Sequence, residues 1–479
     1  MAISRLIEPD RVIGVLRDLS QANMEFRADL ILPYRPDYQH EPIHGRFVLV
    51  EVADENEALL GRIAGLRAEG KLVSGEGEDY LLRTVGFNTP IPDDIRGRYL
   101  KYRVNIRVLG LLRRRVNDSS AVFVASHRRL THVGSRVALP SDEVLKLVAG
   151  HHREGAALGH LALGEFVWAR GDETLRPEPW MRLLGPVIEP KFQVERLVAR
   201  RTAVFARSGF GKSNLLKLLF SELYRGEGPR VPKRGGHESP VATVIFDRDG
   251  EYFWPDARAR PGLCDVSHLD DKLVVFTSRT PPSDFYGSFV AGSVKLDIRR
   301  LAPETVVGIA LGPERQEQQN VRKLKALPWD RWRELVDLIH DQRHSADLAQ
   351  VRKLLGLEGN QQDVEALAAR SNIAYIVQML HDPSSRLLDM LLEALKQGKL
   401  CVIDLSLLSG EAALALSGIL LRHIFGHNVE QFTRAEAESL SIIAVLEEAQ
   451  SVLGQGAAST SPFMAWVKEG RKYDLGAVL

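Results

Sequence analysis

The residues from Ala206 to Ser213 fit the phosphate-loop pattern, in which a small residue and four variable positions precede Gly-Lys-Ser. Successive backbone N–H groups of such a loop bind phosphate oxygens at the start of a helix, and the lysine adds a positive charge. The serine hydroxyl is a ligand for Mg²⁺. The pattern therefore predicts a nucleotide site formed by Ser208, Gly209, Phe210, Gly211, Lys212, Ser213 and Asn214.

A second candidate group is the acidic pair Glu447-Glu448, which follows the apolar run from Ser441 to Leu446. In an ATP site, a carboxylate at a strand end supports Mg²⁺ through water, and the next carboxylate can orient and deprotonate the attacking water. A strand that runs into an acidic helix start is the alternative. Together with the phosphate loop, the pair predicts Glu447 as a metal-supporting residue and Glu448 as the catalytic base.

The elements around these residues predict an α/β domain over residues 146–479. The apolar run Thr202 to Phe205 enters the phosphate loop and the residues after it have helical spacing, which favours a true site over a chance match. Further strands are expected at Val241–Phe246, Lys272–Thr277 and Lys399–Ser406. A helical insertion is expected over about residues 300–396, with helices at Arg315–Leu324, Trp329–Arg343, Leu348–Leu355, Gln362–Ala369 and Arg386–Leu395.

Residues 1–145 read as a separate, mostly β domain. Short runs rich in Val and Ile at Arg11–Leu16, Phe47–Val52 and Tyr102–Leu109, separated by turn residues, predict a small barrel or sandwich. One helix is expected within this domain, from Asn56 to Glu69. The basic cluster Arg113-Arg114-Arg115 is interpreted as a solvated rim rather than a DNA contact.

Composition limits the class of protein. The chain has 479 residues and a net charge of +1, with 44% hydrophobic and 26% charged residues, and a chain this long is expected to form two or three domains. It has no run of eighteen apolar residues, no N-terminal signal segment and only two cysteines. We expect a cytoplasmic protein with no membrane segment, in which any nucleic-acid surface is local.

The motifs, taken in order, resemble those of the HerA-like DNA-translocating ATPases, relatives of the FtsK DNA pumps within the RecA-like P-loop class. The phosphate loop is one of them. The stretch Asp247 to Tyr252 is similar to the family's Asp-x-x-Gly-Glu-Tyr strand end, and Glu447-Glu448-Ala449 to its acidic pair. The other similar stretches are Gly45–Val48 and Leu60–Ile63 of the family's β-barrel, Val402–Ser406, and Glu469–Tyr473.

This resemblance implies a RecA-like P-loop ATPase core with a helical insertion, preceded by a small N-terminal β-barrel. It implies a homo-hexameric ring with double-stranded DNA in its channel and ATP between subunits. Lys212 and Ser213 would hold the phosphates and Mg²⁺, with Glu447 supporting the metal and Glu448 acting as base. Arg471 is the candidate charge donor to a neighbouring subunit, with a structural salt bridge as the alternative.

Three further expectations follow from the resemblance. Asp247 and Glu251 are expected near the γ-phosphate, with a structural turn as the alternative. Gln450 stands where the family has histidine, and the chain stops at Leu479, which suggests a truncated C-terminus. The DNA contacts are predicted at Arg230, Lys233 and Arg234, or at the loop Gly454 to Ser461, with an exposed loop as the alternative for each.

The leading functional hypothesis is an ATP-driven motor on double-stranded DNA that works with a partner nuclease in DNA end processing. In a second version the ring serves antiviral defence, with a nuclease or a sirtuin-like NAD hydrolase docked on the barrel. The alternative is an ATP-binding ring that only scaffolds the effector, although Lys212, Glu447 and Glu448 argue against it. A small-molecule kinase has no use for the barrel, and a conjugation-type coupling ATPase would need membrane spans.

Overall fold

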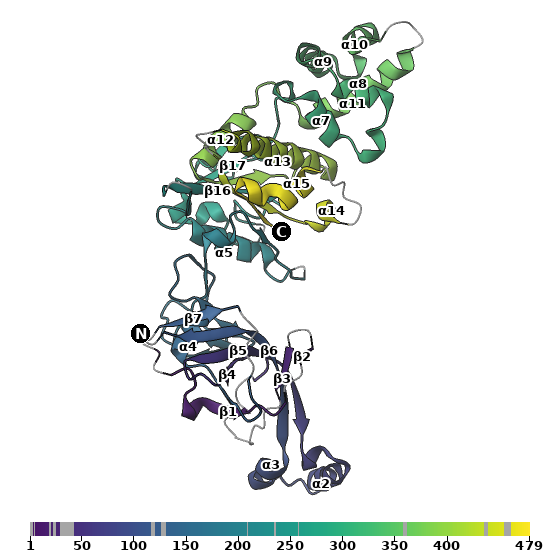
Figure 1. Ribbon diagram of the computed structural model, residues 1–479. Helices are drawn as coiled ribbons and strands as arrows, with labels where there is room; N and C mark the ends of the chain where they lie inside the picture. Colours follow the sequence, from purple (N-terminus) through teal and green to yellow (C-terminus); the bar gives the residue numbers. More distant parts are fainter. Residues whose placement is uncertain are drawn as a thin grey trace. The chain divides into compact units, whose positions relative to one another are not determined.

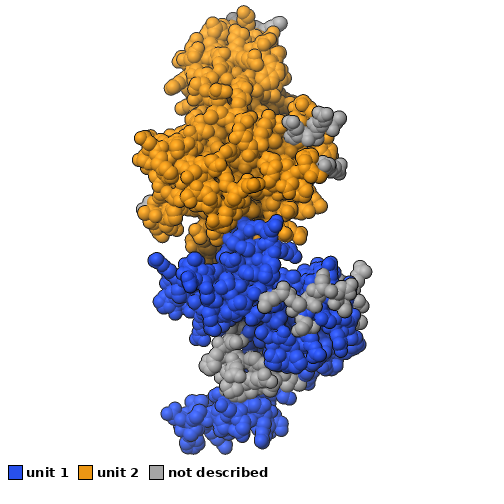
Figure 2. Space-filling view, turned by 90° about the vertical axis from the view of Figure 1, so that its left-hand side faces the viewer, with its two compact units in different colours: residues 1–191 blue, residues 192–479 orange. Residues whose placement is uncertain are grey.

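The structure of the chain is a computed structural model that divides into two compact units, Met1–Lys191 and Phe192–Leu479 (Figures 1 and 2). The domain boundary predicted after residue 145 stays a prediction, because a division into compact units does not show where the ATPase domain begins. The residues that the structure describes are 3, 5–18, 21–22, 25–28, 43–115, 120–125, 131–207, 209–233, 236–256, 258–357, 362–434, 439–454 and 461–479.

The first unit contains an antiparallel sheet with the strand order β1-β8-β4-β5-β6-β3-β2, and β7 also pairs with β6. Among the described strands this order has two ends, and closure into a barrel stays a prediction. The strands are β1 Val12–Val15, β2 Gln21–Ala22, β3 Glu25–Ala28, β4 Phe47–Glu51, β5 Glu57–Glu69, β6 Lys101–Arg114, β7 Ala121–Val124 and β8 Arg136–Ala138.

The helix expected from Asn56 to Glu69 is wrong, because Glu57–Glu69 is the strand β5. Its backbone hydrogen-bonds to β4 on one side and β6 on the other, with Leu60 opposite both Leu49 and Gly110. At Gly61 a Cβ atom would lie 2.2 Å from the Cγ2 atom of Ile106, so the Ile106 side chain covers the strand where glycine leaves room. Pairing with strands on both sides, of which β6 is distant in sequence, therefore decides the conformation of this segment.

The rest of the first unit consists of short elements. Helix α4 follows Ser141 at its N-cap and ends at Gly150, which has a left-handed backbone. Helices α2 and α3 lie between β5 and β6 in the sequence. The bounds are α2 Gly75–Gly86, α3 Asp93–Tyr99, α4 Asp142–Ala149, β9 Ala156–Ala157, β10 Ala162–Leu163, β11 Phe166–Trp168, β12 Arg182–Leu184 and β13 Lys191–Phe192.

The second unit is built on a parallel sheet with the order β14-β21-β20-β16-β19-β17-β18, to which β15 adds an antiparallel strand beside β16. The strands are β14 Arg201–Thr202, β15 Arg230–Pro232, β16 Glu238–Asp247, β17 Leu273–Phe276, β18 Val290–Gly292, β19 Leu400–Asp404, β20 Ser441–Leu446 and β21 Leu475–Val478. The strands expected from the apolar runs at residues 241–246, 272–277 and 399–406 all lie in this sheet.

Helices cover both faces of this sheet (Figure 1). Helices α12 and α13 lie on one face and α5 on the other. Successive residues of the central strand β16 are all buried from Val241 to Asp247, which is the pattern of a parallel strand with two covered faces. The bounds are α5 Lys212–Leu223, α6 Asp284–Gly287, α12 Leu387–Lys396, α13 Gly410–Phe432, α14 Gln450–Leu453 and α15 Pro462–Glu469.

Helices α7 to α11 follow β18 and precede α12 in the sequence, and they form a cluster of their own (Figure 1). Trp332 is fully buried in this cluster, and its indole N–H donates to the carbonyl of Ile298 at 3.0 Å. The helices are α7 Pro303–Ala310, α8 Gln319–Lys325, α9 Trp329–Gln342, α10 Leu348–Leu355 and α11 Asp363–Leu380. In contrast, α12 packs against β16 and β19 and belongs to the layer over the sheet. No helix among the described residues is long and apolar enough to cross a membrane.

Candidate active site

A cavity of about 830 Å³ in the second unit lies at the carboxyl ends of the parallel strands. Open α/β sheets place ligands at this edge, and a cavity of this size can hold a nucleotide. Residues of the phosphate loop, the turn after β16 and the acidic pair after β20 line it together, among them Gly209, Gly211, Lys212, Ser213, Asn214, Asp249, Glu251, Glu447, Glu448 and Gln450.

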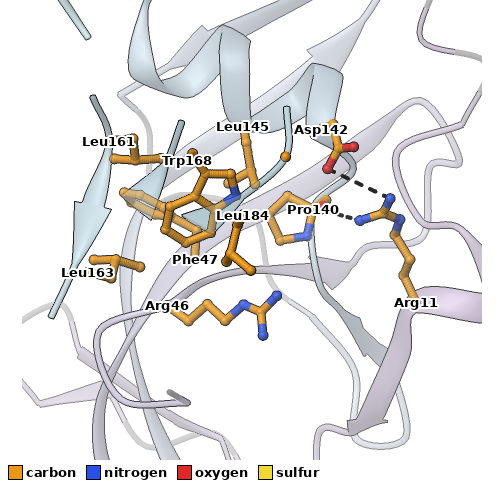
Figure 3. Close-up of a pocket in the computed structure, with 11 residues that line it drawn as sticks. Arg11, Arg46, Phe47, Pro140, Asp142, Leu145, Leu161, Leu163, Trp168 and Leu184 are labelled. Carbon is orange, nitrogen blue, oxygen red and sulfur yellow. Dashed lines mark hydrogen bonds and ion pairs between the residues drawn. The ribbon is translucent and has the colours of Figure 1, made fainter. Parts of the chain in front are cut away.

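A cavity of about 140 Å³ lies in the first unit (Figure 3). Trp168 and several leucines line it, and Arg11 closes one side by donating to the carbonyl of Pro140 at 3.2 Å and pairing with Asp142 at 3.9 Å. A volume of this order fits about one benzene ring. This cavity contains none of the predicted site residues and is too small for a nucleotide.

The phosphate loop has the backbone that the pattern requires. Gly209 and Gly211 have φ angles of 80° and 84°, in the region that favours glycine, and α5 begins at Lys212. The Phe210 side chain is 75% exposed, so its bulk lies outside the loop. Ser208 lies outside the described residues. The N–H groups at the start of α5 and the Lys212 side chain thus border the same cavity.

Glu447 is held by neighbours from the turn after β16. Its Oε1 atom accepts a hydrogen bond from the Tyr252 hydroxyl at 3.0 Å, and its Oε2 atom accepts one from the backbone N–H of Arg248 at 3.4 Å. Burial, together with the nearby charge of Asp247, raises the pKa of Glu447 to about 7. A carboxyl group of this kind binds a proton near neutral pH and can exchange it for a divalent cation.

Glu448 is exposed and its backbone has a φ angle of 52°, which is unusual for a residue with a side chain. This conformation ends strand β20 and turns the chain at the edge of the cavity. The amide of Gln450 donates to the Glu448 carboxylate. The residue that replaces the family's histidine is therefore in contact with the predicted catalytic base.

The two acids predicted in the turn after β16 differ in their surroundings. Asp247 is fully buried and accepts hydrogen bonds from the backbone N–H groups of Gly250, Glu251 and Tyr252 at 2.8, 3.2 and 3.0 Å. Burial raises the pKa of Asp247 to about 6 even though these N–H groups oppose the shift. Asp247 thus fixes the turn, which supports the structural alternative for this residue, whereas Glu251 lines the cavity.

Arg471 does not line the nucleotide cavity. It shares a separate hollow of about 230 Å³ with Arg200 and Arg201, at the edge of the sheet formed by β14 and β21. Within the part of the chain that the structure describes, Arg471 forms no ion pair, so the salt bridge considered as its alternative is absent there. The structure therefore places Arg471 beside two arginines that sequence reasoning missed.

The basic residues predicted to contact DNA lie at the opposite edge of the sheet from the cavity. Arg230 in β15 pairs with Glu238, and its guanidinium donates to the Glu238 carbonyl at 3.1 Å. The Lys233 ammonium pairs with Asp474 just before β21. Arg234 and residues 455–460 lie outside the described residues. The described cations thus have partners within the chain, and their contact with DNA stays a prediction.

Sequence reasoning also missed three residues around the cavity. Tyr252 ends the Asp-x-x-Gly-Glu-Tyr stretch, but its contact with Glu447 joins residues 195 positions apart and leaves no local signal. Lys217 and Arg260 line the cavity, although Arg260 is paired with Asp256 and Lys217 donates to the carbonyl of Pro261 at 3.4 Å. The helical spacing of Lys217 after Ser213 was the only signal available for it.

Comparisons with known proteins found one matching family and several similar solved structures. The family model of the helicase HerA central domain matches residues 182–424, about half of the chain, which include the phosphate loop and the Asp247 turn but not the acidic pair. The bacterial conjugative coupling protein TrwBdeltaN70 matches in an unbound monoclinic form and in a trigonal form in complex with sulphate, each with 15% identity and a TM-score of 0.31.

Each of these two matches covers 58% of this chain and 61% of the coupling protein's chain, so the chain spans about three fifths of that protein's length. No curated protein matches the sequence. The family match and the parallel α/β sheet confirm the predicted RecA-like P-loop core, while the N-terminal barrel stays a prediction.

Proposed function

The chain belongs to the family of the helicase HerA central domain, whose members are P-loop ATPases, and from this membership we propose that it is an ATP-driven translocase on double-stranded DNA. The observation that carries the proposal is the cavity of about 830 Å³ at the carboxyl ends of the strands. It brings the phosphate loop and the acidic pair together although they are far apart in the sequence. This combination is the minimum that ATP hydrolysis requires.

Within this cavity, the proposed roles follow the chemistry of each group. Lys212 and the N–H groups of the loop bind the β- and γ-phosphates of ATP. Glu448, exposed at the cavity edge, orients the attacking water and accepts its proton. The contact with Gln450 keeps the Glu448 carboxylate beside the loop.

The residues present also fit Mg²⁺. The Ser213 hydroxyl and the Glu447 carboxylate both contact the hydroxyl of Tyr252, so a hard oxygen ligand and a carboxylate lie close together beside the phosphate loop. They would hold the cation together with the phosphates, with Glu447 acting through water. When bound, Mg²⁺ neutralises negative charge on the phosphate oxygens.

The proposed assembly is a homo-hexameric ring around the duplex. Arg471, Arg200 and Arg201 share a hollow that contains no residue of the nucleotide cavity, which supports a role at the nucleotide site of another copy. We place them against the γ-phosphate of ATP bound to the neighbouring subunit, where a guanidinium stabilises the charge of the transferring group. The proposal also includes a separate effector, either a nuclease or a sirtuin-like enzyme, that docks on the N-terminal sheet. The complex would act in DNA end processing or antiviral defence.

The decisive experiment is ATP hydrolysis by the full chain with and without linear duplex DNA. We expect duplex DNA to stimulate hydrolysis, and Glu448→Gln to lower the rate about 10²–10⁴-fold because it removes the base. Equal affinity of both proteins for a nonhydrolysable ATP analogue is the control for folding. Hydrolysis that is the same with and without DNA would contradict a DNA motor and favour the scaffold alternative.

A further inference from the structure

Tyr252 is a buried side chain that joins the two groups proposed to hold Mg²⁺. Its exposed fraction is 0%, and its hydroxyl donates to the Oε1 atom of Glu447 at 3.0 Å. The same hydroxyl is in contact with the Ser213 hydroxyl at the start of α5. One phenol therefore connects the phosphate loop to the end of β20.

The backbone around Tyr252 holds this hydroxyl in place. The N–H of Tyr252 donates to Asp247 at 3.0 Å, and its carbonyl accepts from the N–H of Leu263 at 2.8 Å. Arg279 donates to the Gly250 carbonyl at 3.3 Å, and its guanidinium lies over the rings of Phe253 and Trp254 at 5.3 and 5.1 Å. These contacts fix both sides of the turn from which Tyr252 projects.

The chemistry of a serine ligand explains why a phenol suits this position. A serine hydroxyl binds a cation through an oxygen lone pair and keeps its proton, which then needs a hydrogen-bond acceptor. The Tyr252 oxygen can accept that proton's hydrogen bond while its own hydrogen is donated to Glu447. Residues that orient metal ligands in this way often determine metal affinity nearly as strongly as the ligands.

We propose that Tyr252 is a positioning residue that orients the Ser213 hydroxyl and the Glu447 carboxylate for Mg²⁺ in the nucleotide complex. The inference rests on the proposed ATP site and adds a residue to it. It implies that Tyr252 contributes to the part of nucleotide affinity that depends on Mg²⁺, and not to the part that the phosphate loop supplies alone.

The test compares Tyr252→Phe with Tyr224→Phe in the full chain. Tyr224 is a matched control because it is also buried and its hydroxyl donates to the Val241 carbonyl at 3.0 Å, at the other end of the sheet. Binding of the fluorescent analogue N-methylanthraniloyl-ADP is measured in Mg²⁺ and in EDTA. We expect Tyr252→Phe to bind normally in EDTA and to raise the Mg²⁺ concentration needed for tight binding by about 10–100-fold.

Tyr224→Phe should lose thermal stability but keep the wild-type dependence on Mg²⁺. A wild-type Mg²⁺ dependence in Tyr252→Phe would overturn the inference, and so would an equal loss of affinity in Mg²⁺ and EDTA, which would show a structural role. If the wild-type protein binds no nucleotide under either condition, the proposed ATP site itself is wrong, and the two failures are thereby distinguished.

Discussion

At the scale of single residues, the two carboxyl groups Asp247 and Glu447 show how burial prepares a site. Both are held by hydrogen bonds at neighbouring strand ends, with Phe246 and Leu446 paired in register just before them. Burial, together with the nearby charge of Asp404, raises the pKa of Asp247 to about 6, and burial, together with the charge of Asp247, raises that of Glu447 to about 7. The cost of ionising two buried acids side by side is offset when a cation arrives.

The stability of the nucleotide-free protein should therefore depend on pH through Glu447. Its folded pKa of about 7 lies above the ordinary value of 4.5, so its contribution to stability is present below pH 4.5 and is lost as the pH rises to about 7. Glu447→Gln fixes the neutral form. We expect this variant to raise the unfolding temperature relative to wild type at pH 8 but not at pH 5. The rise should be roughly 2–4 °C for each kcal/mol gained in the free energy of unfolding.

Thermal unfolding of both proteins without nucleotide at the two pH values measures this effect. Glu448→Gln is the matched control, since it makes the same change one residue along at an exposed position. An equal effect of Glu447→Gln at pH 5 and pH 8 would contradict the assigned pKa.

At the scale of elements, strand β21 aligns the segment that enters the phosphate loop. The N–H of Ala477 donates to the Arg200 carbonyl, and that of Val204 to the Leu479 carbonyl, each at 2.8 Å. Gly476 allows the close approach behind this alignment, because a Cβ atom there would lie 2.2 Å from the backbone oxygen of Leu197. The Trp466 indole donates to the Gly476 carbonyl at 2.9 Å and fixes the strand from α15.

Adding one methyl group at Gly476 should therefore displace backbone rather than a flexible side chain. We expect Gly476→Ala to lower the free energy of unfolding by about 1–3 kcal/mol and to weaken nucleotide binding. Gly426 lies within α13, and a Cβ atom there would have nothing within 4 Å. Gly426→Ala should therefore raise the free energy of unfolding by up to about 1 kcal/mol. Urea unfolding of the two variants measures these changes in the free energy of unfolding. An unchanged value for Gly476→Ala would show that the backbone at this sheet edge accommodates the methyl group.

At the scale of the whole molecule, the proposed site residues of the second unit lie on two separate surfaces. The nucleotide cavity and the hollow with Arg200, Arg201 and Arg471 share no residue. A contact that pairs different surfaces of identical subunits closes into a ring when its rotation permits. The separation of the two surfaces is compatible with the proposed ring.

Mixing two inactive variants tests this arrangement. We expect Lys212→Ala and Arg471→Ala each to abolish most ATP hydrolysis, because one lacks the phosphate contact and the other lacks the donor to its neighbour. After random mixing and reassembly, about a quarter of the interfaces carry both intact groups, and the same fraction of activity should return. If the mixture stays as inactive as its components, Arg471 does not act on a neighbouring subunit.

The sequence by itself determined the phosphate loop, the acidic pair, the helix Leu348–Leu355 and the buried strands of the second unit, because each depends on residues within a few positions of one another. It misjudged β5, whose conformation depends on hydrogen bonds to β4 and β6. The spacing of apolar residues also gave no order for the strands in the sheet. That order is what places Glu447 beside Asp247.

Only the tertiary structure decided the contact of Tyr252 with Glu447 and the gathering of Arg200, Arg201 and Arg471 in one hollow. These residues lie in different elements, and nothing in their local sequence specifies the partner. A helix or strand records its own periodicity in its sequence, whereas a contact between distant elements arises when sheet order and packing bring their ends together.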